Sequence, residues 1–534
     1  MPVAEPDLGC GDEILGGECA LKRAKLDPAG EIVKGSPTEP SLAKSKNCRN
    51  YAMAKRKKST YERLVSGSPN RQQCKKLQRQ FDADSAELVV VHANAAGVDV
   101  GNASHFVSVP PERDQTPVRE FGSWTADLRD MVAWLKSCGI TTVVMQSTGV
   151  YWIAIYDLLE QAGFEVYLVN ARGTKNLPGR KSDVQECQWL RKLHTYGLLR
   201  KSFRPPQQIR EVRTLWRLRG RVLEDSSRAV QHIQKALTTM NVQLANAISD
   251  VSGVTGMAIV RAILQGQRDP HELAKLRDPH IQASEEEIAH SLEGNWQPDV
   301  LFELQQVVDA YDFHRQQLTT IDTELQKYMT ALPTREPVGE VSADVSKLSA
   351  KLRKKLKANR KSKDNRPAFD LGAELARLMG VDLRLIDGID VMTAQTIYSE
   401  VGTDLSDWPT EDHFASWLEL APRNNITGGK VIKKEKRRSN NRVTTALRNA
   451  AESLVRSDSY LGARYRHFTG RLVGLKGVKA MARYLACLVY RLLTKGPAWV
   501  DRGAAYYENK RRDRELVGLH RKAAAAGMKL VPIT

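Results

Sequence analysis

The chain has 534 residues and a formal net charge of +19, with 81 Lys and Arg against 62 Asp and Glu. A protein this basic most often binds a polyanion, and nucleic acid is the commonest one, although a basic surface can also serve solubility. Its 41% hydrophobic content supports folded cores, in about three domains on the usual length prior. The seven cysteines form no CxxC pair, which argues against a disulfide framework and a cysteine zinc site.

The beginning of the chain carries no recognisable targeting signal. It is acidic and lacks the hydrophobic region of a signal peptide, and no apolar run approaches the roughly 20 residues of a membrane span. We therefore expect a cytoplasmic protein with no membrane partner. Residues 1–85 mix Gly, Pro, Ser and charge without a periodic apolar face, and we expect a largely disordered basic arm that touches phosphates nonspecifically.

Residues 86–204 alternate between strand and helix patterns. The predicted strands are residues 98–101, 105–109, 141–145 and 164–169. Three helices are predicted. One ends before Gly139, the second spans residues 150–162, and the third begins after Ser182, a typical N-cap residue. This alternation predicts an α/β domain with a mixed sheet, and sites in such sheets gather at the strand ends.

Three acidic residues form a candidate metal site. Asp99 lies in a short apolar run, where a buried carboxylate needs a partner. Asp183 and Glu186 are three residues apart, so both carboxylates project from one face of the predicted helix near its N-terminal end. Together the three acids could hold a hard cation such as Mg²⁺. Gln146, at the end of a predicted strand, would line the same edge of the sheet.

Residues 205–333 are predicted to be mainly helical. A long basic amphipathic stretch begins near residue 213, and a second spans residues 300–328. Two long helices of opposite direction could pair as a coiled-coil arm; a compact helical subdomain is the alternative. Residues 334–367 are strongly basic and form either a linker or a phosphate-contacting segment.

Residues 368–510 are predicted to form a mainly helical C-terminal domain, followed by a tail at 511–534. Ile386-Asp387-Gly388-Ile389 resembles the hairpin of helix-hairpin-helix DNA binders, whose backbone N–H groups can face phosphate. Residues 424–430 form a glycine turn that carries the Thr427 hydroxyl, with Lys430 beside it. A hydroxyl beside glycines and cations is a plausible phosphate site, and a solvated loop is the alternative. The basic residues predicted to contact nucleic acid are Arg180, Lys181, Arg423, Lys433, Lys434, Arg437, Arg438 and Arg442.

Six groups of residues, in the same order, resemble those of a known family. They are Gly97-Val98-Asp99-Val100-Gly101, Ser147-Thr148-Gly149-Val150-Tyr151-Trp152, Asn170-Ala171-Arg172 with Pro178-Gly179-Arg180-Lys181-Ser182-Asp183, Asp387-Gly388-Ile389-Asp390, Phe414-Ala415-Ser416-Trp417-Leu418 and Ile426-Thr427-Gly428-Gly429-Lys430. Over residues 91–507 the chain thereby resembles the DEDD-type insertion-sequence transposases of the IS110 family and its “IS eleven-eleven” subgroup.

The resemblance implies a fold, an activity and partners. It implies a RuvC-like, RNase-H-type α/β domain, then a helical coiled-coil region, then a mainly α C-terminal transposase domain that bears a hydroxyl nucleophile. In this family the acidic site and the hydroxyl cut and rejoin DNA through a covalent phospho-enzyme, and a structured RNA encoded beside the gene selects the target. The implied partners are DNA at the element ends and target, a guide RNA, and further copies of the chain in a dimer or tetramer. The implied setting is the bacterial nucleoid.

The resemblance also implies a role for each candidate residue. Asp99, Asp183 and Glu186 would hold Mg²⁺, and Thr427 would be the nucleophile. Lys430 would stabilise the charge of the transition state.

The chain departs from the family pattern at three positions. Gln146 stands in place of the second acid, Glu186 replaces the usual fourth aspartate, and Thr427 stands where most relatives have serine. Two further functions therefore stay open. One is a RuvC-like Holliday-junction nuclease that uses water and does not need Thr427, and the other is a catalytically inactive nucleic-acid-binding relative.

Overall fold

The computed structural model describes most of the chain from residue 89 onward. The described residues are 89–147, 149–170, 182–338, 365–422, 424–427, 430–434, 441–472, 474–496 and 503–531, with backbone alone for 424–427, 430–434 and 503–507. The predicted arm at residues 1–85 and most of the predicted basic linker at 334–367 lie outside the described residues.

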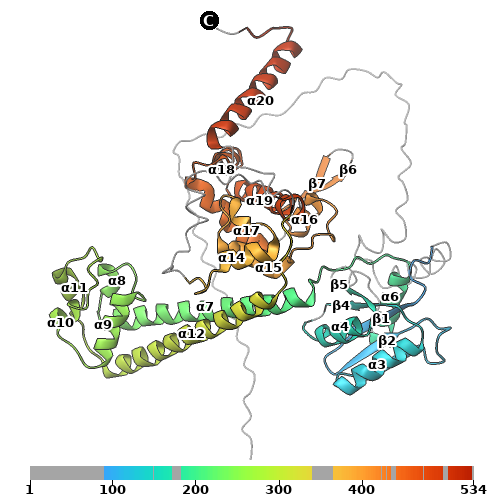
Figure 1. The fold of residues 1–534 in the computed structure, drawn as a ribbon, viewed down its shortest axis with the longest axis horizontal. Helices are drawn as coiled ribbons and strands as arrows, with labels where there is room; N and C mark the ends of the chain where they lie inside the picture. Colours follow the sequence, from blue (N-terminus) through green and yellow to red (C-terminus); the bar gives the residue numbers. More distant parts are fainter. Residues whose placement is uncertain are drawn as a thin grey trace, which may run out of the picture. The chain divides into compact units, whose positions relative to one another are not determined.

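The first part of the described chain is an α/β domain built on a five-stranded mixed sheet (Figure 1). The strand order is β3-β2-β1-β4-β5; β1 pairs antiparallel with β2 and parallel with β4, and β4 pairs parallel with β5. This arrangement fits an RNase H-like fold and confirms the predicted mixed sheet. The strands are β1 (Ala95–Val100), β2 (Ser104–Ser108), β3 (Val118–Gly122), β4 (Thr142–Gln146) and β5 (Glu165–Val169).

Helices cover both faces of the sheet. On one face, α3 (Thr125–Ser137) and α4 (Trp152–Gln161) pack on alternate strand residues such as Val98 and Met145. On the other face, α6 (Asp183–Thr195) packs Leu190 against strand residues of opposite orientation. The alternation follows from the two-residue period of strand side chains.

Four of the five strands were predicted, and β3 was not. Its sequence, VREFG, carries two charges and a glycine, a composition that is weak in strand signals. It pairs with β2 alone, at the edge of the sheet. Charged residues are common on edge strands because they discourage pairing with other chains.

Gly97 in β1 allows α6 to lie unusually close to the sheet. A Cβ atom added to Gly97 would lie 2.3 Å from the backbone oxygen of Cys187 and 2.5 Å from the backbone nitrogen of Arg191. Both atoms belong to the helix backbone, which cannot move aside as a flexible side chain can. Only glycine therefore permits this contact between the middle of α6 and the middle of β1.

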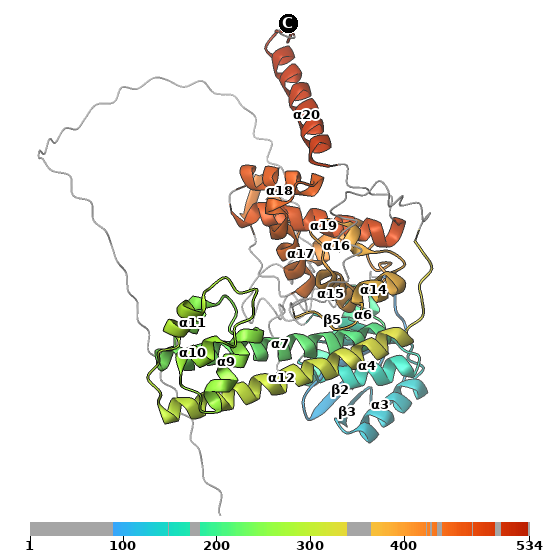
Figure 2. The same cartoon turned by 60° about the vertical axis from the view of Figure 1, so that its left-hand side comes forward.

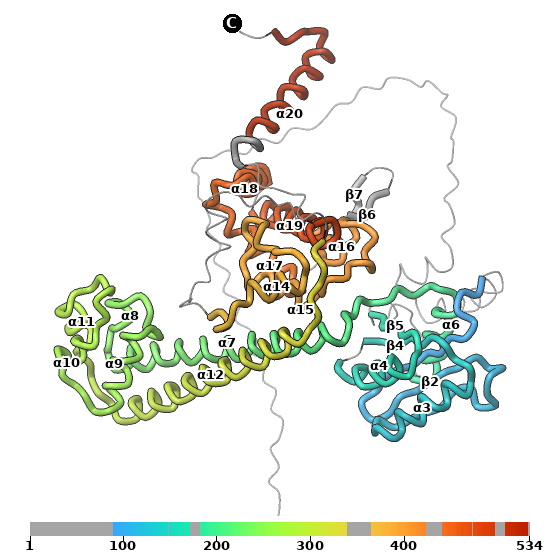
Figure 3. Tube along the Cα trace, viewed as in Figure 1, coloured from blue at the N-terminus to red at the C-terminus, as the bar shows by residue number. Residues whose placement is uncertain are grey.

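Two long helices form an arm with a folded tip. The helices α7 (Gln207–Thr239) and α12 (Pro298–Ala331) run antiparallel and side by side (Figures 1 to 3). Between them, a separate hydrophobic core unites the tip helices with the ends of α7 and α12. The tip helices are α8 (Leu244–Ala247), α9 (Val254–Leu264), α10 (Pro270–Ala274) and α11 (Glu285–Ser291). A coiled coil in the strict sense stays a prediction for this arm.

A buried ion pair joins the two helices of the arm. Arg219 on α7 donates from Nε to Asp322 Oδ1 on α12 at 2.5 Å and from Nη2 to Oδ2 at 3.2 Å. Both side chains are nearly inaccessible to solvent, and Val222, Leu318 and Ile321 pack beside them. A buried charge of this kind is stable only with its partner, so the pair fixes which residues of α7 and α12 stand opposite each other.

The C-terminal domain is a helical assembly that encloses the largest hydrophobic core of the described chain, which also takes in the start of α7 and the end of α12. Its helices are α14 (Leu371–Met379), η3 (Leu383–Leu385), α15 (Val391–Val401), α16 (Glu411–Trp417), α17 (Arg442–Ser453), η4 (Leu454–Arg456), α18 (Tyr460–Arg471), α19 (Leu475–Lys495) and α20 (Gly503–Ala525). The antiparallel strands β6 (Asn424–Thr427) and β7 (Lys430–Lys434) occupy the predicted glycine turn and the residues after it. None of the described helices has the length and apolarity to span a membrane.

An ion network fastens α7 to the C-terminal domain. The nearly buried Glu400 of α15 accepts hydrogen bonds from Arg217 at 2.8 and 2.7 Å. Arg213 donates to the backbone oxygens of Ser399 and Glu400 at 3.2 and 2.6 Å. Burial lowers the pKa of Arg213 to about 10, with Glu400 opposing the shift, so the guanidinium stays charged at neutral pH.

The predicted helix-hairpin-helix turn packs inward. Gly388 has φ +88, and a Cβ there would lie 2.8 Å from the backbone oxygen of Ala450 on α17. The Asp387 carboxylate accepts hydrogen bonds from the hydroxyls of Ser457, at 2.6 Å, and Ser459. This turn therefore contacts α17 and the start of α18, and the comparison with a DNA-binding hairpin is not supported by its surroundings.

Replacing Gly97 with alanine should destabilise the α/β domain. The added methyl group would push α6 from β1, and overpacking of this kind typically costs about 1–3 kcal/mol. Chemical denaturation would measure the loss. Gly470→Ala on α18 is the matched control, because a Cβ there meets nothing within 4 Å; that change should be neutral or slightly stabilising. Equal stability of both variants would contradict the close contact.

Candidate functional site

The candidate site lies where two neighbouring parallel strands end. Val98 of β1 pairs with Met145 of β4, and the next residues along the two strands are Asp99 and Gln146. The sheet therefore brings these two predicted site residues to one edge. The close packing of α6 on β1, made possible by Gly97, brings that helix to the same strand.

A hydrogen bond joins the strand to the helix at this edge. The Gln146 amide donates from Nε2 to Glu186 Oε1 at 2.7 Å. Gln146 is only 2% exposed, and a polar group so deeply buried needs a partner. Since Glu186 is partly exposed, its carboxylate satisfies Gln146 while still facing the surface. Two of the predicted site residues thus contact each other directly.

Asp99 lies close to the second turn of α6. The negative charge of Asp99 contributes to raising the pKa of Cys187 to about 12, although burial of the thiol is the larger cause. Cys187 is fully buried and follows Glu186 directly in the helix. The thiol stays protonated and is not a candidate nucleophile at neutral pH.

Asp183 is the first residue of α6 and is exposed. The Ser182 hydroxyl caps the helix by accepting from the Gln185 backbone N–H at 3.4 Å, which confirms the predicted N-cap. Carboxylates in the first turn are favoured by the helix dipole. The position of Asp183 therefore has a sufficient structural explanation as well as a functional one.

The three acids suit a hard divalent cation by their chemistry, because Mg²⁺ prefers carboxylate oxygens. However, no three His, Cys, Asp or Glu side chains within the described ranges are grouped so as to hold a metal ion. One oxygen of Glu186 accepts from Gln146 instead. The structure thus brings Asp99, Gln146 and Glu186 to one edge without assembling the predicted ligands, and their metal-binding role stays a prediction.

The second half of the predicted site lies on the β6–β7 hairpin. Thr427 ends β6, Lys430 begins β7, and the two residues pair directly across the hairpin. The register shifts at Asn425 and Ile426, where one strand has an extra residue. The side chains of this hairpin, including those of Lys433 and Lys434, lie outside the described residues.

Most of the residues predicted to contact nucleic acid are also not described. Arg180, Lys181, Arg423, Arg437 and Arg438 lie outside the described residues. Arg442 is exposed at the start of α17, and a Cβ added to Gly220 would lie 3.8 Å from its guanidinium. The Arg442 side chain therefore reaches towards α7 of the arm.

Sequence reasoning missed a second basic region, on α18 and α20. Tyr460, Arg464, His467 and Arg471 share one face of α18, and their spacing of four, three and four residues was the available signal. Neither helix was predicted. The helix α20 runs from Gly503 to Ala525 across the boundary at residue 510 that we expected between domain and tail.

Two family models match the chain, one in each half. The DEDD transposase model of IS110, described as Transposase, matches residues 96–242, which are the α/β domain and α7. The model described as Transposase IS116/IS110/IS902 family matches residues 380–466 of the C-terminal domain. No curated protein matches the chain.

These matches define the protein as a transposase, an enzyme that recombines DNA. The chain belongs to the IS110 family of DEDD transposases, as its residues predicted.

Changing Gln146 to glutamate tests whether the edge of the sheet where β1 and β4 end can bind a cation. The test needs no activity assay. Gln146→Glu would place a second carboxylate at hydrogen-bond distance from Glu186, and like charges this close repel. Without divalent cations, we expect the melting temperature to fall by about 4–8 °C, which corresponds to roughly 2 kcal/mol in a large domain. Adding Mg²⁺ should raise the melting temperature of this variant more than that of the wild type.

The matched control is Gln146→Leu, which also loses the hydrogen bond but adds no charge. Its melting temperature should fall and should not respond to Mg²⁺. A Gln146→Glu protein equally insensitive to Mg²⁺ would argue against a cation site at this edge.

Proposed function

We propose that the chain cuts and rejoins DNA strands with the Thr427 hydroxyl as nucleophile and with Asp99, Asp183 and Glu186 as the acidic site. The observation that carries the proposal is the Gln146–Glu186 hydrogen bond, which ties the end of β4 to α6 beside the end of β1. It brings Glu186, from a distant part of the sequence, to the end of β4, and sites in α/β sheets gather at the strand ends.

The proposed covalent step exchanges one phosphate ester for another. The Thr427 oxygen attacks a backbone phosphorus, a bond from that phosphorus to a deoxyribose oxygen breaks, and the protein becomes linked to one strand. The hydroxyl proton passes to a base, and the departing deoxyribose oxygen takes up a proton. Attack on the linkage by a hydroxyl from another strand then restores Thr427 and joins the strands.

The surrounding residues have stated roles in the proposal. Asp99, Asp183 and Glu186 would hold a divalent cation such as Mg²⁺, whose charge would neutralise the phosphate and fix the scissile group. Lys430 pairs with Thr427 across the hairpin, and its ammonium would stabilise charge that develops on the phosphate. Threonine is a more crowded nucleophile than serine, so we expect slower attack than a serine would give.

The partners of the proposed reaction are DNA and RNA. The net charge of +19 supports binding of polyanions generally. We propose that the DNA is an element end or its target, that an RNA encoded beside the gene guides the choice, and that copies of the chain act as a dimer or tetramer.

Removing the charge of Asp99 or of Asp183 should affect strand cleavage much more than DNA binding. Asp99→Asn and Asp183→Asn should each reduce strand cleavage by at least about 100-fold, a loss typical of electrostatic groups at a reacting centre. DNA binding should change little, because phosphate contacts elsewhere supply the affinity. Asp130→Asn, an exposed acid on α3, is the control and should cleave normally. Normal cleavage by Asp183→Asn would remove the acid from the site.

Substituting the hydroxyl tests the nucleophile. Thr427→Ala should abolish the covalent protein–DNA adduct, while Thr427→Ser should retain it and form it faster. Denaturing gel electrophoresis would show the adduct, and mass spectrometry would locate it. Ser439→Ala is the control and should be nearly silent. Cleavage without any adduct in the wild type would favour a nuclease that uses water, and an adduct at another residue would refute the assignment.

A further inference from the structure

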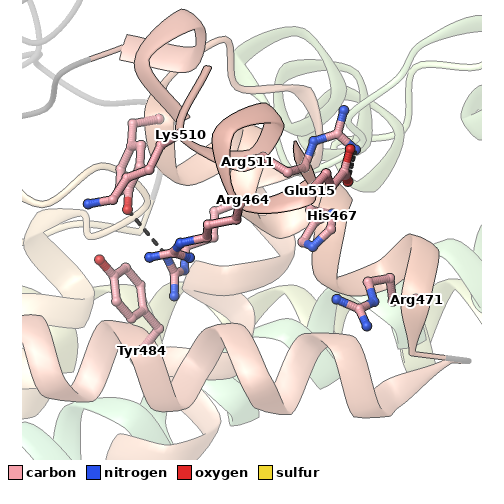
Figure 4. A pocket seen from close by; sticks show the side chains of 9 residues that line it. Arg464, His467, Arg471, Tyr484, Lys510, Arg511 and Glu515 are labelled. Carbon is pink, nitrogen blue, oxygen red and sulfur yellow. Dashed lines mark hydrogen bonds and ion pairs between the residues drawn. The ribbon is translucent and has the colours of Figure 1, made fainter. Parts of the chain in front are cut away.

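A cationic cleft lies between α18 and α20, above α19 (Figure 4). Its volume is about 470 Å³. It is separate from the acidic edge of the α/β domain and from the β6–β7 hairpin, and no residue of our proposed reaction lines it. The matched part of the C-terminal domain ends at residue 466, so most of α18's last turn and all of α19 and α20 lie beyond the family match.

The charge of the cleft is strongly one-sided. Glu515 is the one acidic residue among the described residues that line it. The cationic lining residues are Arg464, Arg471, Lys510, Arg511 and Arg514. Arg511 is partly neutralised, because its guanidinium lies 3.0 Å from Glu508 and 3.8 Å from Glu515. The remaining cations leave a clear excess of positive charge, which attracts an anion.

Arg464 is held rigidly at the base of the cleft. Its Nη1 donates to the Tyr460 hydroxyl at 3.1 Å, and its guanidinium carbon lies 3.9 Å from the centre of the Tyr484 ring. Stacking on an aromatic ring fixes the plane of the guanidinium. A cation fixed in advance loses little conformational entropy when it binds a ligand.

Two tyrosines form a neutral part of the cleft lining. Burial and a hydrogen bond with Tyr460 raise the pKa of Tyr484 to about 12, so its hydroxyl keeps its proton at neutral pH. Figure 4 shows Tyr484 and Arg464 on one side of the cleft and Arg471 and His467 further along it. A ligand with several acceptor oxygens suits such a row of cations.

The exposed cations form the outer part of the cleft. Arg471 ends α18, and Arg514 lies on α20; both are exposed. Both side chains are therefore open to solvent, where a strand lying along the two helices could reach them. A phosphodiester, with a single negative charge and two acceptor oxygens, matches a fixed arginine flanked by exposed ones.

We propose that this cleft binds a backbone phosphate of a nucleic-acid strand. The choice of nucleic acid as the polyanion rests on the proposed function. Arg464 anchors the phosphate, Arg471 and Arg514 close on it from the two helices, and the contact is independent of base sequence. The cleft is thus a positioning site that holds a strand away from the reacting atoms.

The test compares two double variants of equal charge. Arg471→Ala with Arg514→Ala removes two of the exposed cations of the cleft, one from each helix. The control, Arg512→Ala with Arg521→Ala, removes two exposed arginines of α20 that do not line it. Fluorescence anisotropy with a labelled single-stranded DNA, and with an RNA of the same sequence, would give affinity at several salt concentrations.

We expect the cleft variant to bind at least one of the two probes on the order of tenfold more weakly than the control, as for loss of charge-assisted hydrogen bonds. The slope of log affinity against log salt should become shallower by about 0.7 for each phosphate of the single strand that the variant no longer neutralises. Weaker binding confined to DNA or to RNA identifies the strand that the cleft holds. Equal affinity and slope in both variants would overturn the proposal.

Two further measurements keep the outcome unambiguous. Circular dichroism should show unchanged helix content, and Arg471→Gln with Arg514→Gln, which keeps more aliphatic packing, should reproduce the effect. Strand cleavage is measured in parallel on the wild type. If the wild type cleaves and the cleft variant binds like the control, the proposal for the cleft is wrong and the proposed function stands. If the wild type never cleaves but the cleft variant binds more weakly, the proposed function fails and the cleft stands.

Discussion

The carboxylate of Glu400 holds α7 against the C-terminal domain, and the packing of the domains depends on this contact. It lies almost buried on α15 and accepts from Arg217, while Arg213 bonds the neighbouring backbone oxygens. Removing one member of such a network would leave a buried charge uncompensated, which typically costs about 3–5 kcal/mol. Just before these arginines, Arg204 and Arg210 pair with Asp157 on α4 at 2.8 and 3.1 Å. A few turns of one helix, and the segment leading into it, thus contact the α/β domain and the C-terminal domain alike.

The start of α7 joins the two domains between which the groups of the proposed reaction are divided. The acids lie on the α/β domain, and Thr427 lies on a hairpin of the C-terminal domain, so neither domain alone holds every group. Phe203, in the segment before α7, packs against Trp408 and Trp417 at ring-centre distances of 4.6 and 5.4 Å. The connection between the two parts is therefore made of packed aromatic rings and ion pairs rather than a loose linker.

Periodicity predicted the α/β domain well because its core strands alternate and its helices have apolar faces. It failed at β3, where an edge strand needs little apolar content, and at α18 and α20, where basic residues hide the helical pattern. The candidate acids were proposed from residue type and from family resemblance. Their partners were not: nothing in the sequence ties Gln146 to Glu186, because that hydrogen bond depends on how closely α6 lies on β1. Likewise, the sequence shows Gly97 only as part of a motif. The structure explains why glycine is needed there, because the backbone of α6 lies too close to β1 for a Cβ atom.

The buried pair of Arg219 and Asp322 limits how the arm can change in evolution. Beyond this pair, about 20 residues of α7 and 24 of α12 lead to the tip, or roughly 30–36 Å at 1.5 Å per residue. One residue inserted in either helix would rotate everything beyond it by about 100° and expose its apolar stripe. Relatives with longer or shorter arms should therefore differ by about seven residues at a time, in both helices together. The length of the arm, and with it the reach of its tip, would then change only in discrete steps.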